Sequence, residues 1–292
     1  MVAEFVVRTW LVSPSATVAN VRYQWNYLPH ARVVFSTEGW SASRTNSMGL
    51  LDDEPRVPRA PVRALLLGDS YAEALQVRRR DNFSSVAEER MPGLEVLNTG
   101  CSGRGPQDYA DWLAEFGAAL APDVVVVCFN AGDLVSLEQM ARSGRSLRPR
   151  PTGPSPPPPP EGPLARLAHR VLRSSGLITA ARQRFKLVAQ QILENPFTPF
   201  RPPRPSRAAA MSDDELSDPR LAAMLDSLHV RFAARAPRLV YLYLPVMDYF
   251  APTPHRGDAA AARVMHDFAA RHHATLVDMY EPMRAEFVRT GR

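Results

Sequence analysis

Residues 123–129 read DVVVVCF, and this run of β-branched and apolar residues sets the class of fold. A strand that is apolar throughout must be covered on both faces, which is typical of a central strand in a parallel sheet. Further short apolar runs predict strands at residues 62–67, 94–97, 238–244 and 274–277. Helical patterns separate these runs, at residues 83–91, 107–120, 213–236 and 258–272. The repeated alternation of strand and helix predicts an α/β fold, with a parallel sheet between two layers of helices.

A proline-rich segment interrupts this pattern and divides the chain into four parts. Residues 1–60 show no regular pattern and are expected to be irregular. We assign residues 61–140 and 213–292 to the first and second parts of one α/β domain. Between them, residues 141–212 hold much of the proline and form an insertion that favours polyproline II structure around an amphipathic helix at residues 164–195. The insertion is either a tethered excursion without a function or a proline-rich ligand for a partner domain.

The composition argues against several classes of function. The chain has 292 residues and a net charge of +5, and all but one of its 35 basic residues are arginine. These arginines are spread along the chain and not gathered on one element with aromatic residues, which argues against a nucleic-acid partner. No apolar stretch is long enough to span a membrane, and residues 1–10 lack the pattern of a signal peptide. Two cysteines cannot form a disulfide framework, and no spacing of residues indicates a metal or a cofactor.

Three loops that follow expected strands carry the candidate chemistry, because reactive groups gather at the carboxyl ends of parallel strands. The first, Gly68-Asp69-Ser70, places a serine hydroxyl at a tight turn, as a nucleophile or only as a helix cap. The second, residues 98–105, spaces its glycines G-x-x-G-x-G, which does not match the dinucleotide-binding pattern. Because its glycines have no side chain, their backbone N–H groups either approach a substrate closely, or the glycines are needed only for a turn with positive φ. The third, residues 130–133, offers the Asn130 amide as a donor to an oxyanion or as a turn cap.

Together these loops resemble the sequence blocks of the SGNH (GDSL) hydrolase superfamily. The segment LLLGDSYAEAL at residues 65–75 looks like block I, and NTGCSGRGPQD at residues 98–108 is similar to block II. The segment DVVVVCFNAGDL at residues 123–134 is similar to block III. Upstream, TNSMGL at residues 45–50 resembles a segment that precedes block I in one bacterial branch. The resemblance is weaker in the second half of the domain, over residues 238–290.

The resemblance implies a flavodoxin-like fold, with a parallel sheet between two layers of helices in a three-layer α/β/α arrangement. It also implies an enzyme that hydrolyses acyl esters of small molecules or carbohydrates without a metal or cofactor. Ser70 matches the nucleophile of the family, and Gly103 matches the glycine whose N–H joins the oxyanion hole. Block III usually reads G-x-N-D, so that aligning Asp133 puts Gly132 where the family has asparagine. Either Asn130 supplies this donor from two residues upstream, or the oxyanion hole has one donor fewer.

The family takes its acid and its general base from a D-x-x-H motif near the C-terminus, and we expect this chain to lack that motif. A serine hydroxyl is a weak nucleophile unless a base accepts its proton. The last expected strand is followed only by residues 278–292, so we interpret the chain as an incomplete domain that lacks the motif. Residues 4–8 resemble the end of a membrane-anchor segment in relatives, so we expect that an anchor is missing as well. Within the chain, His255 lies in a loop beyond Asp248 and is a candidate substitute base. Cys101 is a further candidate nucleophile, although no histidine is near it in sequence.

Three functions are compatible with these residues. The first is a serine esterase or deacylase that forms an acyl intermediate on Ser70. The second keeps this intermediate but transfers the acyl group to a sugar hydroxyl, as in polysaccharide O-acetylation. The third is a catalytically degenerate SGNH fold that serves as a binding module, which Gly132 and the expected loss of D-x-x-H favour. The resemblance suggests an exported protein, and the sequence leaves the acyl chain, the alcohol and the oligomeric state open.

Overall fold

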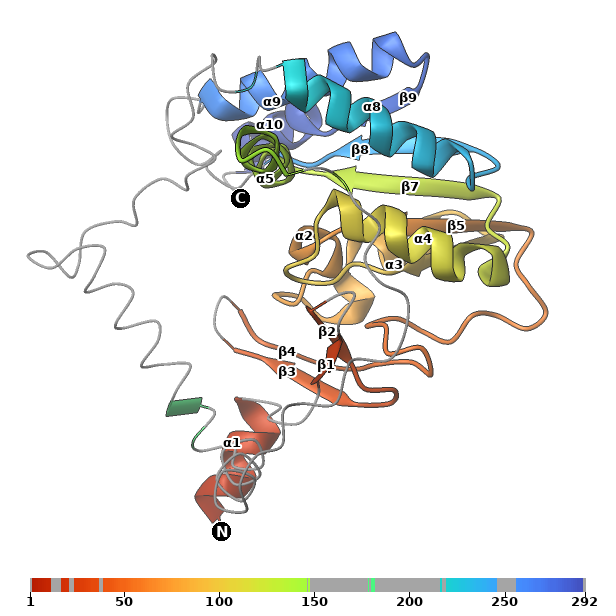
Figure 1. Ribbon diagram of the computed structural model, residues 1–292. Helices are drawn as coiled ribbons and strands as arrows, with labels where there is room; N and C mark the ends of the chain where they lie inside the picture. Colours follow the sequence, from red (N-terminus) through yellow and green to blue (C-terminus); the bar gives the residue numbers. More distant parts are fainter. Residues whose placement is uncertain are drawn as a thin grey trace, which may run out of the picture. The chain divides into compact units, whose positions relative to one another are not determined.

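The computed structural model in Figure 1 describes residues 2–11, 17–20, 24–36, 39–145, 147, 178, 180–181, 216, 219–245 and 256–290. The chain divides into two compact units. Met1–Glu54 and Ala74–Val86 belong to the first unit, and Pro55–Glu73, Ala87–Arg150 and Pro205–Arg292 belong to the second. Among the described residues, no helix is long and apolar enough to cross a membrane.

The second unit is built on a parallel sheet of five strands in the order β6-β5-β7-β8-β9. The strands are β5 (Val62–Leu67), β6 (Leu94–Asn98), β7 (Val124–Phe129), β8 (Leu239–Tyr243) and β9 (Thr275–Asp278). Every neighbouring pair is parallel. The second strand in the chain therefore lies at one edge and the first lies between the second and the third, which is the flavodoxin-like order. The predicted α/β fold class is confirmed.

Helices cover both faces of this sheet. They are α2 (Ser70–Glu73), α3 (Phe83–Arg90), α4 (Pro106–Leu120), α5 (Ala131–Arg142), α8 (Pro219–Ala233), α9 (Arg256–Arg271) and α10 (Tyr280–Thr290). Helix α8 contacts α4, α5 and α9, and Figure 1 shows α4 and α8 running along the sheet. Leu65, Leu66 and Leu67 in β5 are each at most 3% exposed. Because consecutive strand residues point to opposite faces, both faces of β5 are buried.

Aromatic side chains fill the space between β8 and the helices that pack on it. Tyr241 in β8, Phe232 in α8 and Phe268 in α9 are each at most 1% exposed. The Tyr241 ring meets Phe268 edge-on, with 5.0 Å between centroids, and meets Phe232 in the same manner at 6.5 Å. Full burial of each such side chain contributes about 1.5–3 kcal/mol. This cluster fixes α8 and α9 on the sheet.

The first unit contains short regular elements in the region where the sequence predicts irregular structure. They are α1 (Val2–Trp10), β1 (Thr17–Asn20), β2 (Gln24–Tyr27), β3 (Arg32–Phe35) and β4 (Ser41–Arg44). The 3₁₀ helix η1 (Arg79–Asp81) also belongs to the first unit but lies outside residues 1–60. Strands β1 and β2 form one antiparallel pair, and β3 and β4 form another. Each strand has only four residues, which is too short for an alternation of apolar and polar residues to stand out in the sequence. The expectation for residues 1–60 is corrected accordingly.

Most of the expected insertion at residues 141–212 lies outside the described residues. The same holds for its helix at residues 164–195, apart from residues 178 and 180–181. The five strands of the sheet fall on either side of this segment, three before it and two after it. The role of the proline-rich segment stays a prediction.

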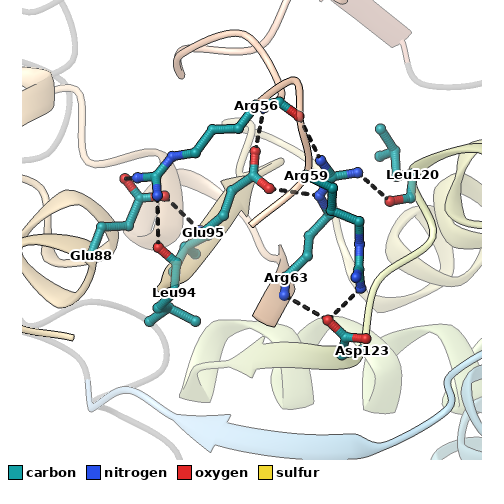
Figure 2. Close-up of polar contacts among 9 residues, drawn as sticks. Arg56, Arg59, Arg63, Glu88, Leu94, Glu95, Leu120 and Asp123 are labelled. Atoms are coloured by element: carbon teal, nitrogen blue, oxygen red, sulfur yellow. Dashed lines mark hydrogen bonds and ion pairs between the residues drawn. The ribbon is translucent and has the colours of Figure 1, made fainter. Parts of the chain in front are cut away.

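A buried ion pair lies at the amino ends of the strands (Figure 2). Arg63 in β5 donates from Nε to Oε2 of Glu95 in β6 at 2.7 Å, and the two side chains are 8% and 3% exposed. The other guanidinium nitrogens of Arg63 donate to the carbonyl oxygens of Leu120 at 2.8 Å and Arg56 at 3.3 Å. Asp123, which precedes β7, accepts the backbone N–H of Arg63 at 2.7 Å. These bonds join the amino ends of β5, β6 and β7, whereas the three candidate loops follow the carboxyl ends of these strands.

Candidate active site

Ser70 lies just past the carboxyl end of β5, at the first residue of α2. Gly68 makes this sharp turn possible, because a Cβ atom there would stand 2.5 Å from the Cβ atom of Ala72 and 3.2 Å from that of Cys128. The Ser70 side chain is half-buried, and its hydroxyl forms no hydrogen bond with any described residue. The hydroxyl therefore does not cap α2 by accepting a hydrogen bond from a backbone N–H group of that helix.

The loop that follows β6 packs directly on α2. A Cβ atom at Gly100 would lie 2.7 Å from the carbonyl carbon of Ala72. The Cys101 N–H donates to the carbonyl oxygen of Gly68 at 3.2 Å, and Asn98 Nδ2 donates to the carbonyl oxygen of Ala72 at 2.8 Å. Close backbone contact thus holds this glycine-rich loop beside the turn that carries the serine.

A buried carboxylate, Glu73 at the end of α2, fastens the same loop. Glu73 is 4% exposed, and its Oε2 accepts the backbone N–H of Ser102 at 2.8 Å as well as the Ser102 hydroxyl. The next residue, Gly103, has a φ of 80°, which favours glycine. Gly103 is exposed, and its N–H has no acceptor in the described part of the chain. Glu73 therefore fixes the loop that presents this unused donor.

Asn130 bonds the loop after β7 to the serine turn. Its Nδ2 donates to Oδ2 of Asp69 at 2.9 Å, and its Oδ1 accepts the backbone N–H of Asp133 at 3.2 Å as the N-cap of α5. Asp69 also holds the turn itself, since its Oδ1 accepts the N–H of Tyr71 at 2.9 Å. An amide nitrogen carries two hydrogens. The second hydrogen on Asn130 Nδ2 has no acceptor among the residues that the structure describes, although the side chain is only 2% exposed.

Gly132 leaves room for the Asn130 side chain. A Cβ atom at Gly132 would lie 2.9 Å from Asn130 Oδ1, closer than real Cβ contacts come. The carboxamide that begins at position 130 thus occupies the space beside position 132, where the G-x-N-D pattern has its asparagine. The two positions cannot both carry a side chain without a rearrangement.

Two buried carboxyl groups lie on either side of Asn130. Burial raises the pKa of Asp69, and burial together with the charge on Asp69 raises the pKa of Asp133 well above its usual range. Tyr109 Oη donates to Oδ1 of Asp133 at 3.3 Å, and burial raises the pKa of the Tyr109 phenol. All three shifts favour the neutral forms of these groups, because burial disfavours their charged forms.

The expectation that the chain lacks a D-x-x-H sequence is wrong, because one begins at Asp226 and ends at His229, on α8. Asp226 Oδ1 lies 2.7 Å from Nε2 of His272, which follows the end of α9 shortly before β9 begins. His229 Nδ1 lies 2.9 Å from the hydroxyl oxygen of Tyr241, in the middle of β8. The motif thus lies toward the amino ends of these strands, away from the edge where Ser70 lies, and it cannot accept the proton of Ser70.

Acidification is expected to destabilise the fold through His229. Burial lowers the pKa of His229, and the charge of His272, whose ring stacks on it with 4.1 Å between centroids, lowers it further, whereas the charge of Asp226 raises it. In the unfolded chain this imidazole takes up a proton at a pH of about 6.5, whereas in the folded chain it does so only at a lower pH. Between these two pH values the unfolded state binds more protons, so the free energy of unfolding decreases as the pH drops from about 6.5 through the pKa of the folded state. Urea titrations at about pH 7.5 and 5.5 should show this loss in the wild-type chain and a smaller loss in His229→Gln. The exposed His273→Asn is the control, and equal losses in all three proteins would contradict the expectation.

None of the predicted catalytic residues is hydrogen-bonded to the Ser70 hydroxyl in the described part of the chain. His255 lies outside the described residues. His266 Nε2 lies 2.9 Å from Asp278 Oδ2 at the carboxyl end of β9, but β9 is three strands from β5, about 14 Å at the usual strand spacing. Burial raises the pKa of the Cys101 thiol to about 12, which disfavours the thiolate that a nucleophile requires. Within the described ranges, no three His, Cys, Asp or Glu side chains gather to hold a metal ion.

Comparison with known proteins gives one match by sequence and several distant matches by fold. The profile of the GDSL-like Lipase/Acylhydrolase family matches residues 66–290, and a search of curated proteins found no match. A member of the lipolytic protein G-D-S-L family from Veillonella parvula is 10% identical, with a TM-score of 0.42 over 79% of this chain and 84% of that chain. An acetylxylan esterase from Geobacillus stearothermophilus is 14% identical, with a TM-score of 0.40 over 78% and 80%. An alpha/beta hydrolase enzyme from the metagenome of Lake Arreo, Spain, is 15% identical, with a TM-score of 0.42 over 79% and 82%.

Proposed function

The chain belongs to the GDSL-like lipase/acylhydrolase family, a family of ester hydrolases, and we propose that it cleaves carboxylic esters through an acyl intermediate on Ser70. The observation that carries this proposal is the 2.9 Å bond from Asn130 Nδ2 to Asp69 Oδ2, because it joins the loop after β7 to the serine turn. The glycine-rich loop after β6 is bonded to the same turn through the Cys101 N–H and the Gly68 carbonyl. A hydroxyl flanked by N–H donors at the carboxyl edge of a parallel sheet suits acyl transfer.

In the proposed reaction, Ser70 Oγ attacks the ester carbonyl carbon while its proton passes to a general base. The carbonyl oxygen becomes an oxyanion, which accepts hydrogen bonds from the N–H groups of Ser70 and Gly103 and from the second amide hydrogen of Asn130. The alcohol then leaves with a proton returned by the base, and the acyl group stays on Ser70. A water molecule, activated by the same base, releases the carboxylic acid and restores the hydroxyl.

The general base of this mechanism comes from outside the described residues. Among the described histidines, none bonds to Ser70. His255 is the proposed base within the chain, because in sequence it directly precedes Arg256, the first residue of α9, and follows β8. Connections from β8 to α9 begin at the carboxyl edge of the sheet, which is the edge that holds the serine turn.

A binding module without catalysis is the second candidate. Gly132 at the asparagine position of the G-x-N-D pattern favours it, and so does the position of the D-x-x-H sequence on α8. Transfer of the acyl group to a sugar hydroxyl is a variant of the first candidate, since it uses the same acyl-serine.

Labelling of the full chain with a fluorophosphonate, followed by peptide mass spectrometry, tests the proposal. We expect an adduct on Ser70 together with turnover of p-nitrophenyl acetate. An acyl-serine that forms but is released only when a sugar acceptor is added would identify transfer. Absence of both adduct and turnover would contradict the esterase mechanism and favour the binding module.

The donor role of Asn130 predicts the outcome of a two-residue exchange. Asn130→Gly removes one oxyanion donor and should slow acylation of Ser70 by about 100- to 1000-fold. Adding Gly132→Asn to that variant returns an amide at the position that the G-x-N-D pattern uses and should recover most of the rate. Gly132→Asn alone should bring no gain, because its Cβ atom would stand 2.9 Å from Asn130 Oδ1.

The rate of fluorophosphonate labelling measures these effects, and urea unfolding of each variant separates them from losses of stability. The stability control is needed because Asn130 also caps α5 and bonds Asp69. If the double variant is no faster than Asn130→Gly at equal stability, Asn130 only positions the turn and the oxyanion hole has one donor fewer.

A further inference from the structure

We propose that an arginine-lined pocket in the first unit binds a small oxyanion, a phosphate or a carboxylate group. The pocket has a volume of about 300 Å³ and is lined by Ala42, Ser43, Arg44, Arg78, Arg79 and Arg80. These residues come from β4 and from the segment around η1, and all belong to the first unit. A volume at the low end of the range for ligand pockets fits a small anion. The proposal does not depend on ester hydrolysis.

Two contacts fix the walls of the pocket against each other. The Ser41 hydroxyl, at the start of β4, donates to the carbonyl oxygen of Leu75 at 2.6 Å. Gly39 lies against the same segment, since a Cβ atom there would stand 2.7 Å from the carbonyl oxygen of Gln76. The φ of Gly39, 155°, also suits glycine. The pocket is therefore formed before a ligand arrives.

Acidic residues offset the charge of two of the four arginines. Arg79 bonds Asp53 at 2.8 Å and lies 3.8 Å from Asp52. Arg80 lies 3.7 Å from Asp81, and both side chains are largely exposed. These two arginines thus contribute less to the attraction of an anion than the other two.

Arg44 and Arg78 have no acidic partner among the described residues. Nη1 of Arg44 donates to the carbonyl oxygen of His30 at 2.8 Å, which is a neutral acceptor, and the exposed side chain of Arg78 bonds to no described group. A bound anion would supply the counter-charge that Arg44 and Arg78 lack among these residues.

The guanidinium group determines which anions fit. It presents its N–H donors as a planar fork, and carboxylate and phosphate oxygens are spaced to accept two parallel hydrogen bonds from that fork. A halide ion has no such pair of oxygens. Phosphate and carboxylate share this chemistry, so the experiment must separate them.

Isothermal titration calorimetry of the full chain at low ionic strength tests the site, with inorganic phosphate in one series and succinate in another. We expect saturable binding of at least one anion, weakened at least tenfold in Arg44→Gln and in Arg78→Gln. Arg90→Gln is the matched control, because it removes the same charge from an exposed arginine at the end of α3. Circular dichroism checks folding, and Arg78→Gln remains informative if Arg44→Gln fails to fold.

Each outcome bears on the proposal. Binding of phosphate without succinate identifies a phosphate site, binding of succinate without phosphate identifies a carboxylate site, and binding of both supports the shared chemistry. Absence of saturable binding for either anion overturns the proposal. An equal loss of affinity in Arg90→Gln also overturns it, because the binding would then follow the net charge of the protein and not the pocket.

Discussion

Replacement of Ser70 by alanine is expected to lower ester turnover by about a millionfold, because no other group in the proposed mechanism forms a bond to the acyl carbon. The same change should prevent phosphonate labelling at this position. Since the Ser70 hydroxyl forms no hydrogen bond with a described residue, the free energy of unfolding should change by no more than about 0.5 kcal/mol. Loss of chemistry without loss of stability would distinguish a nucleophile from a helix cap.

Ser227→Ala is the matched control for this experiment. Ser227 is exposed on α8, and its hydroxyl donates to the carbonyl oxygen of Ala223 at 2.9 Å. Its replacement should leave turnover of p-nitrophenyl acetate and labelling unchanged. If Ser70→Ala keeps the wild-type rate, the assignment of the nucleophile is wrong.

Replacement of Glu95 by alanine is expected to lower the free energy of unfolding by about 3–5 kcal/mol, because it leaves the charge of Arg63 buried without its counter-charge. The Arg63 side chain is only 8% exposed, so water cannot replace the lost carboxylate. The backbone N–H of Arg56 also loses its acceptor, Glu95 Oε1 at 2.6 Å. Urea unfolding followed by circular dichroism measures the loss.

A paired replacement separates the charge from the packing of this site. Arg63→Met together with Glu95→Leu removes both charges and should recover most of the lost stability. The exposed control is Glu286→Ala, which breaks the ion pair with Arg289 on α10 and should change stability by less than about 1 kcal/mol. Equal, small effects of Glu95→Ala and Glu286→Ala would show that the buried pair does not stabilise the sheet.

Much of the sheet could be predicted because strands covered on both faces leave a simple pattern in the sequence. The strand predicted at residues 62–67 coincides with β5, and the one predicted at residues 274–277 differs from β9 by one residue at each end. The alternation with helices then predicts a parallel sheet, which brings the loops after the strands to one edge. The neighbourhood of Ser70 and Asn130 follows from this topology.

The polar bonds across the loops could not be predicted in the same way. Asn130 and Asp69 are 61 residues apart, and Ser102 and Glu73 are 29 apart, so neither pair leaves a local periodicity. An acidic residue three positions after the serine was the only signal for Glu73, and such a residue is common on an exposed helix turn. The buried ion pair of Arg63 could not be predicted either, because a single arginine in an otherwise apolar strand does not indicate which residue it bonds.

For the D-x-x-H sequence the difficulty is different, because a short motif does not indicate where in the fold its residues lie. The family pattern predicts the motif after the last strand, whereas Asp226 and His229 carry it on α8. Two residues at this spacing share one helix face wherever the helix lies. Only the contacts with His272 and Tyr241 reveal which edge of the sheet the pair occupies.

The bonds of Glu73 with Ser102 and of Asn130 with Asp69 bear on how the site could tell one acyl chain from another. Neither loop beside Ser70 can swing aside without breaking a partly buried hydrogen bond. A flap that closes over its ligand can adapt to several sizes, whereas a rigid frame accepts a chain or excludes it by steric fit. We therefore expect selectivity among esters to change abruptly with chain length rather than gradually.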